Sequence, residues 1–103
     1  MKYFEVIFME KQEKLVVDFT ECKYFAEMHK RIKEGLKFPD YYGENLDALW
    51  DLISEPRDAF ITIKGIKDLP KSFDEYVQKF LEILDEAKEL QKKYGCVFDF
   101  MVE

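Results

Sequence analysis

Three short runs rich in β-branched and aromatic residues stand far apart in the chain, at residues 14–19, 59–63 and 96–102. The intervals between them carry the spacing of amphipathic helices, and strands joined through helices lie parallel in one sheet. A fourth run, Lys2 to Met9, comes first, and we expect it to pair with residues 14–19 in an antiparallel hairpin. The sequence therefore predicts an α/β fold: a small three-stranded parallel sheet packed against helices, with an extra N-terminal antiparallel edge strand.

The first predicted helix follows Thr20, a candidate N-cap, and ends near Gly35. Its apolar stripe is Phe25, Met28 and Ile32. The longest predicted helix begins with an S-x-x-E capping box, residues 72–75, and stops at Gly95. The stripe of that helix consists of Phe73, Val77, Phe80, Leu84 and Ala87.

Length and charge limit the possible functions. A chain of 103 residues is expected to form a single domain, residues 1–103, with a core that needs no disulfide or metal. The net charge of −6 and the pI of about 4.9 disfavour non-specific binding to nucleic acid or to anionic lipid, since both require positive charge. A basic protein partner would instead be attracted.

The targeting features predict a cytoplasmic protein. The N-terminus lacks the apolar core of an ordinary secretory signal, and no apolar run has the length of a membrane span. Cys22 and Cys96 lack metal-type spacing, and we interpret them as reduced, packed side chains, although the sequence leaves a Cys22–Cys96 bridge open.

Residues 38–54 combine an aromatic, glycine-containing loop with a short acidic helix. Asn45 is a candidate N-cap, and Leu46, Leu49 and Ile53 share one helical face. Asp47, Asp51 and Ser54 share another face. The two neighbouring like charges cost the helix roughly 0.2–0.5 kcal/mol. Because the chain keeps two like charges at this cost, we interpret the acidic face as a weak indication of a binding partner.

The residues alone leave several functions open. The chain contains no phosphate-binding glycine motif and no H-E-x-x-H, C-x-x-C or G-x-S-x-G motif. Asp47 and Asp51 suit a metal or acid–base pair only weakly, and a solvated helix face is the simpler interpretation. Tyr41, Tyr42 and Trp50 fit either a peripheral core or a protein-binding surface. His29 lies beside an apolar stripe, as packed histidines do.

The run PDYYGENLDALWD, residues 39–51, resembles the signature of the barstar family, intracellular inhibitors of secreted bacterial ribonucleases. The resemblance is strong from Lys14 to Ile53, including Met28-His29, and weaker in residues 60–63, 86–88 and 95–96. It implies a small parallel sheet packed against helices. It also implies that the loop and the acidic helix plug the basic groove of a barnase-like ribonuclease.

The resemblance implies a role for individual residues. Asp51 would mimic an RNA phosphate, pairing with the enzyme's arginines and blocking its catalytic histidine. Asp47 would pair with a basic residue on the guanine-binding loop, Tyr41 would pack against the catalytic histidine, and Gly43 would let the two backbones approach. The remaining partner contacts that the resemblance implies are Asn45, Trp50, Ser54 and Glu86.

This chain departs from the family pattern in three places. The segment before Glu13 lacks a counterpart in shorter members, residues 55–58 replace a glycine, an aromatic residue and an acid, and the long helix has extra residues at 90–93.

We therefore expect a ribonuclease inhibitor that is not an enzyme, is monomeric, and uses no cofactor, metal, nucleic acid or membrane. Two alternatives stay open. One is a barstar-like immunity module for a different toxin or regulator. The other is a metal-dependent enzyme that uses Asp47 and Asp51.

Overall fold

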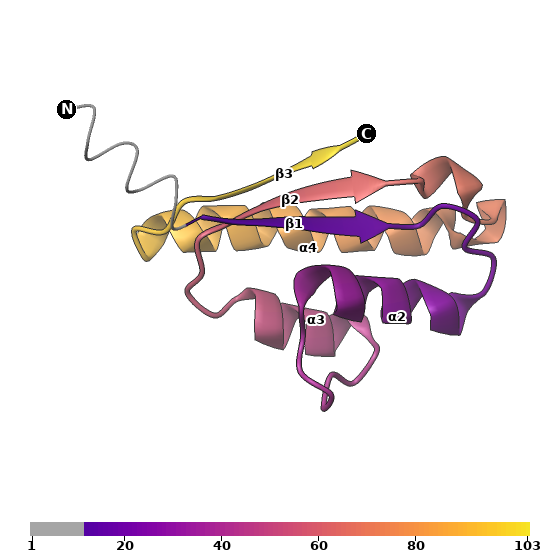
Figure 1. Ribbon diagram of the computed structural model, residues 1–103. Coiled ribbons are helices and arrows are strands. Elements are labelled where there is room, and N and C mark those ends of the chain that lie inside the picture. Colours follow the sequence, from indigo (N-terminus) through magenta and orange to yellow (C-terminus); the bar gives the residue numbers. More distant parts are fainter. Residues whose placement is uncertain (1–11) are drawn as a thin grey trace.

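The computed structural model describes residues 12–103 (Figure 1). The elements follow one another in the order β1 (Glu13–Asp18), α2 (Phe25–Leu36), α3 (Leu46–Ile53), β2 (Ala59–Lys64), η1 (Ile66–Asp68), η2 (Lys71–Phe73), α4 (Asp74–Lys93) and β3 (Phe98–Val102). The three predicted runs of β-branched and aromatic residues form the three strands, as expected from their strand-favouring composition.

The strands form one parallel sheet in the order β1-β2-β3, which confirms the predicted three-stranded parallel sheet. The register pairs Leu15 with Ile61 and Ile61 with Phe100. The predicted strand from Lys2 to Met9 lies outside the described residues. Within residues 12–103, β1 pairs with β2 alone and in parallel, so the antiparallel hairpin is not supported.

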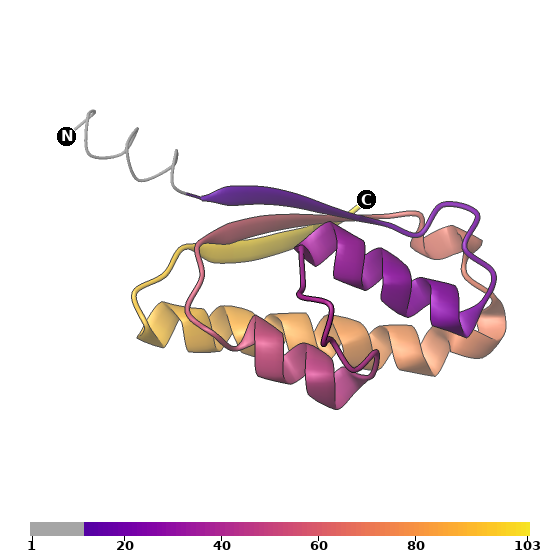
Figure 2. The same cartoon turned by 60° about the horizontal axis from the view of Figure 1, so that its bottom comes forward.

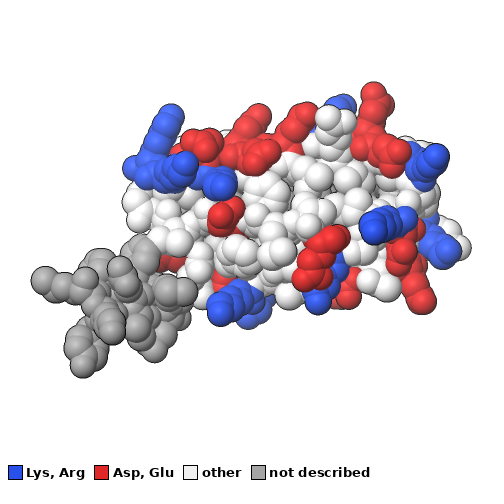
Figure 3. Space-filling model, turned by 90° about the horizontal axis from the view of Figure 1, so that it is seen from above, with Lys and Arg blue, Asp and Glu red and all other residues white. Residues whose placement is uncertain are grey.

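Helices α2, α3 and α4 all lie on one side of the sheet, so the molecule has two layers (Figure 2). Alternate strand residues face the helices, and Val17, Ile61 and Ile63 are completely buried there. The opposite face is seen in Figure 3, where most of the surface over the sheet is neither basic nor acidic. Val16 of β1 and Met101 of β3 are exposed on that face, on either side of Thr62 of the central strand β2.

Helix α2 begins later than the sequence predicts. Thr20 does not cap it, because the Thr20 hydroxyl and backbone N–H both donate to the Asp18 carboxylate in the turn after β1. The N-cap is Tyr24, which makes no capping side-chain hydrogen bond. The Asp18 side chain accepts from the backbone N–H two residues further on, which is an Asx turn, and this turn replaces the expected cap.

Helix α2 ends at Leu36, near Gly35 as predicted, but Gly35 itself serves close packing and not the helix stop. The residue in the left-handed conformation that ends the helix is Lys37, with φ 56°. A Cβ on Gly35 would collide with the Val16 carbonyl oxygen and would lie 2.9 Å from the Val17 Cα. The glycine therefore lets the backbone of α2 approach the backbone of β1.

The ends of α4 test two further predictions. The capping box is wrong, because residues 71–73 form a 3-10 turn and Ser72 makes no capping hydrogen bond. The stop at Gly95 is confirmed: Gly95 has φ 76°, and the next N–H, that of Cys96, donates to the Gln91 carbonyl oxygen.

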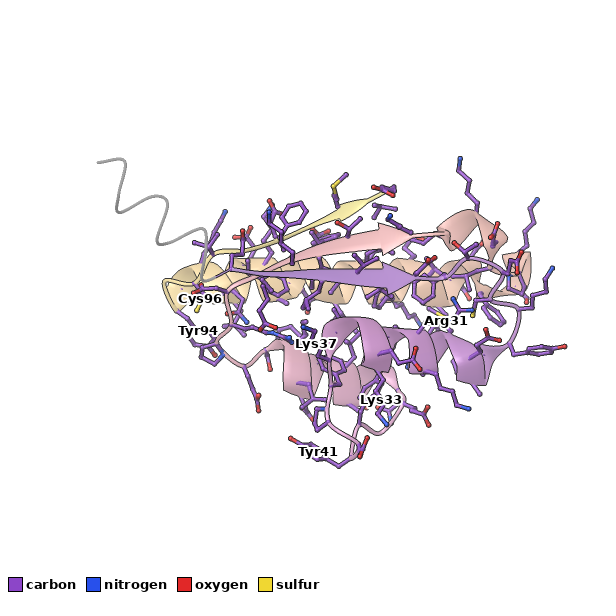
Figure 4. All side chains as sticks on the ribbon, viewed as in Figure 1. Arg31, Lys33, Lys37, Tyr41, Tyr94 and Cys96 are labelled. Atoms are coloured by element: carbon purple, nitrogen blue, oxygen red, sulfur yellow. The ribbon has the colours of Figure 1, made fainter. Side chains whose placement is uncertain are left out.

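Both cysteines are free thiols, Cys22 buried and Cys96 half-buried. Cys96 lies beside the end of α4 (Figure 4). Cys22 follows β1 and Cys96 precedes β3, so they lie at opposite ends of a parallel sheet. Strands of five or six residues separate those ends by about 17–20 Å. This is beyond the Cα separation that a disulfide allows.

Candidate protein-binding surface

The loop after α2 turns sharply into α3. Tyr42 N–H donates to the Pro39 carbonyl oxygen at 3.0 Å. The Asn45 side chain accepts from Ala48 N–H at 2.7 Å, which confirms Asn45 as the N-cap of α3. The left-handed residue of the loop is Glu44, φ 54°, and not the neighbouring Gly43. A Cβ on Gly43 would lie 3.2 Å from the Ala48 Cβ, so the glycine lets the loop fold against the first turn of α3.

Two adjacent tyrosines of the loop point in opposite directions. Tyr41 is 78% exposed and projects outward from the lower edge of the molecule (Figure 4). Tyr42 is 5% exposed and packs on the Phe38 ring, with ring centroids 5.1 Å apart. The inner tyrosine anchors the loop while the outer one is presented to solvent.

His29 of α2 connects the loop to α4 through its two ring nitrogens. The ring is 1% exposed; Nδ1 lies 2.8 Å from the Tyr42 hydroxyl and Nε2 lies 2.5 Å from the Tyr76 hydroxyl. Burial lowers the pKa of His29, and burial raises the pKa of both tyrosines. This confirms the sequence interpretation of His29 as a packed side chain.

A cavity of about 220 Å³ opens between the loop and α3. It is lined by Tyr41, Tyr42, Gly43, Ala48, Asp51 and Leu52. Three of the predicted contact residues, Tyr41, Gly43 and Asp51, therefore meet at one hollow. The walls are mostly apolar, and Asp51 is the charged residue of the lining.

The predicted faces of α3 separate as the helical spacing indicates. Leu49 and Ile53 are buried and Leu46 is half-buried. Asp47 and Asp51 are exposed, one turn apart, and neither makes an ion pair within residues 12–103. We call the exposed side of the loop and of α3, with Tyr41, Gly43, Asp47 and Asp51, the loop–helix surface.

The other predicted contact residues lie around this surface. Trp50 is half-buried and packs against the core, so only part of its ring is available. Ser54 ends α3, and its hydroxyl lies 3.4 Å from the Asp51 carbonyl oxygen. Glu86 is exposed on α4, a different element. Its inclusion in one contact surface with Asp51 stays a prediction.

Sequence reasoning missed Gln91, which holds the end of α3 in place. This side chain of α4 is completely buried. Its Nε2 donates to the carbonyl oxygens of Ile53 and Glu55, at 3.1 and 2.7 Å. Its Oε1 accepts from Arg57 N–H at 3.0 Å. A single polar residue inside the long apolar stripe was the only sequence feature that could have drawn attention to it.

Within residues 12–103, no three His, Cys, Asp or Glu side chains are grouped so as to hold a metal ion. No helix in this part of the chain is long and apolar enough to cross a membrane.

Fold and surface together define a class: a two-layer α/β protein that presents an acidic and aromatic loop–helix surface. Comparison with known proteins identifies the family. The family model described as Barstar (barnase inhibitor) matches residues 12–103, and the chain belongs to the barstar family.

A relative from Bacillus subtilis (strain 168) is named "Putative ribonuclease inhibitor YrdF". The two proteins are 35% identical over 78 residues, which cover 74% of this chain and 86% of the relative.

Proposed function

We propose that this protein inhibits a secreted bacterial ribonuclease by placing the loop–helix surface in the enzyme's basic active-site groove. The observation that carries the proposal is the meeting of Tyr41, Gly43 and Asp51 around one cavity beside the acidic face of α3. Family membership and the name of the Bacillus subtilis relative support the class of partner.

The charges of the surface fit such a partner. A groove that binds RNA phosphates is lined by basic side chains. Asp47 and Asp51 are exposed without an internal ion pair among the described residues, so their carboxylates are available to those basic side chains. The net charge of −6 attracts a basic partner at long range and should raise the association rate at low salt.

In this proposal Asp51 stands in for a substrate phosphate and pairs with arginines of the enzyme. The enzyme's catalytic histidine enters the cavity beside Asp51 and packs on Tyr41. Asp47 pairs with a further basic residue, and Gly43 allows the two backbones to approach. Asn45, Trp50, Ser54 and Glu86 border the contact. The inhibitor acts as a cytoplasmic monomer, one copy for each enzyme molecule, and protects the cell that makes the ribonuclease.

An inhibition assay tests the proposal. The protein is titrated against a panel of purified secreted bacterial ribonucleases, barnase included, and RNA cleavage is followed. At least one enzyme should be inhibited, and Asp51→Ala should weaken its binding by roughly 2–5 kcal/mol, because the enzyme's buried cations lose their partner.

Asp85→Ala is the matched control. It removes the same charge from an exposed position of α4, three residues before Lys88, which pairs with Asp99 of β3. Asp85 therefore lies on the β3 side of α4, and its removal should leave affinity nearly unchanged. Inhibition that is equally strong in Asp51→Ala and Asp85→Ala would refute phosphate mimicry. Failure to inhibit any ribonuclease would favour a different toxin or regulator as the partner.

A further inference from the structure

His29 occupies the point where the loop meets the rest of the fold. It is the single histidine of the chain, and it is buried beneath the loop. Its two ring nitrogens contact the hydroxyls of Tyr42, in the loop, and Tyr76, in α4. One imidazole thus connects α2, the loop and α4, and Tyr42 continues the connection towards the Asn45 carbonyl oxygen at 3.5 Å.

A neutral imidazole satisfies both tyrosines. It has one N–H and one lone pair, so one hydroxyl accepts from the ring while the other donates to it. A protonated ring has two N–H groups, so both hydroxyls must accept and each must send its own proton elsewhere. The two tyrosines differ in their ability to do so.

Tyr76 is half-buried and can turn its hydroxyl proton towards water. Tyr42 is 5% exposed, and among the described residues its other hydrogen-bond partner is the Asn45 carbonyl oxygen. That contact is at the outer limit of hydrogen-bond length, and the same oxygen already accepts from Leu49 N–H at 2.9 Å. Protonation of His29 therefore pulls Tyr42 towards the start of α3 or leaves its hydroxyl badly placed.

Burial among aromatic rings disfavours the protonated form of His29. Phe25 of α2 lies edge-on, with centroids 5.4 Å apart, and Tyr76 of α4 packs at 5.6 Å. The loop contributes Tyr42, at 5.9 Å, and the carboxylate of Glu44. Burial lowers the pKa of His29, and Glu44 opposes that effect more weakly. The proton thus arrives under acidic conditions.

We propose that His29 is a positioning residue for the loop–helix surface, and that its protonation releases the loop and weakens binding of the partner. This inference rests on the proposed function, since the loop carries Tyr41 and Gly43. A loop that is correctly placed for only part of the time binds with an apparent Kd raised by the inverse of that fraction.

The test compares the wild type with His29→Gln and His29→Leu. Glutamine offers one donor group and one acceptor without titrating near neutrality, whereas leucine offers neither. Binding to a ribonuclease that the wild type inhibits is measured from pH 8 to pH 5. At pH 8 His29→Gln should bind within about threefold of the wild type, and His29→Leu should bind roughly tenfold more weakly, because both tyrosine bonds are lost.

The pH dependence separates positioning from a merely structural role. As the pH falls through the titration of the His29 ring, the affinity of the wild type should fall severalfold more than that of His29→Gln, because the population of the competent loop decreases. The comparison cancels the titration of groups on the enzyme, since both inhibitors meet the same partner. Parallel pH profiles for these two proteins would overturn the inference and leave the proposed function intact.

A second measurement uses the free wild-type protein. The amide resonances of Gly43 and Asn45 should shift with the same pH midpoint as the His29 ring. Resonances that do not follow the ring would overturn the inference even if His29→Gln failed to fold. If the wild type inhibited no ribonuclease, both the proposed function and this inference would be refuted.

Discussion

Replacement of Gln91 by alanine should loosen the end of α3 and destabilise the whole protein. The side chain makes three hydrogen bonds, to Ile53, Glu55 and Arg57, and is completely buried. Each bond contributes about 0.5–1.5 kcal/mol net, so Gln91→Ala should cost about 3 kcal/mol. Backbone groups left without a partner in the interior add to this cost.

Urea unfolding followed by the fluorescence of Trp50, the single tryptophan, measures the loss. With a slope of about 1–3 kcal/mol per molar urea, the midpoint should fall by about 1–3 M. Glu89→Ala is the control on the same helix, because the exposed Glu89–Lys92 pair contributes little. A Gln91→Ala protein within 1 kcal/mol of the Glu89→Ala protein would refute the role assigned to Gln91.

Three further outcomes are expected. Gly35→Ala should lower the free energy of unfolding by about 1–3 kcal/mol in urea titrations despite the better helix propensity of alanine, because its Cβ meets the backbone of β1; equal or higher stability would contradict the close packing. Cys96 should react with a thiol reagent much faster than Cys22, whose pKa is raised by burial, and a Cys22–Cys96 disulfide on a non-reducing gel would contradict the topology. Because the pKa of His29 is lowered, the unfolded chain takes up its proton first, so the stability from the neutral ring is complete above about pH 6.5 and decreases at lower pH; His29→Gln should flatten this part of the stability profile.

Much of the fold could be predicted because its signals are local. Strand positions follow from short β-branched runs, and the cap at Asn45 and the stop at Gly95 depend on residues within a few positions. The exposed acidic face of α3 follows from helical periodicity alone. These features need no knowledge of distant contacts.

Other features could not be predicted, because they depend on competition between local hydrogen-bond partners or on contacts between residues far apart in the sequence. Thr20 had a better local partner in Asp18, and the left-handed residue that ends α2 is Lys37 and not Gly35. Strand pairing at the N-terminus was inferred from alternation, which does not specify a partner.

The candidate site was predicted in its composition but not in its arrangement. Tyr41 and Asp51 both line the cavity but are ten positions apart in the sequence. They come together only because the loop folds back on α3. Gln91 and Tyr76 support the site from α4, far along the chain. Their hydrogen bonds join residues distant in sequence, so no local sequence pattern predicts them.

The central claim is that the loop–helix surface occupies the groove where the ribonuclease binds RNA phosphates. Competition tests it most directly: the apparent Kd of the inhibitor for its ribonuclease is measured against increasing concentrations of a non-cleavable oligonucleotide. The apparent Kd should rise in proportion to the oligonucleotide concentration once that concentration exceeds the oligonucleotide's own Kd, because both ligands need one groove. An apparent Kd that does not change when the groove is saturated with oligonucleotide would show that the loop–helix surface binds elsewhere on the enzyme.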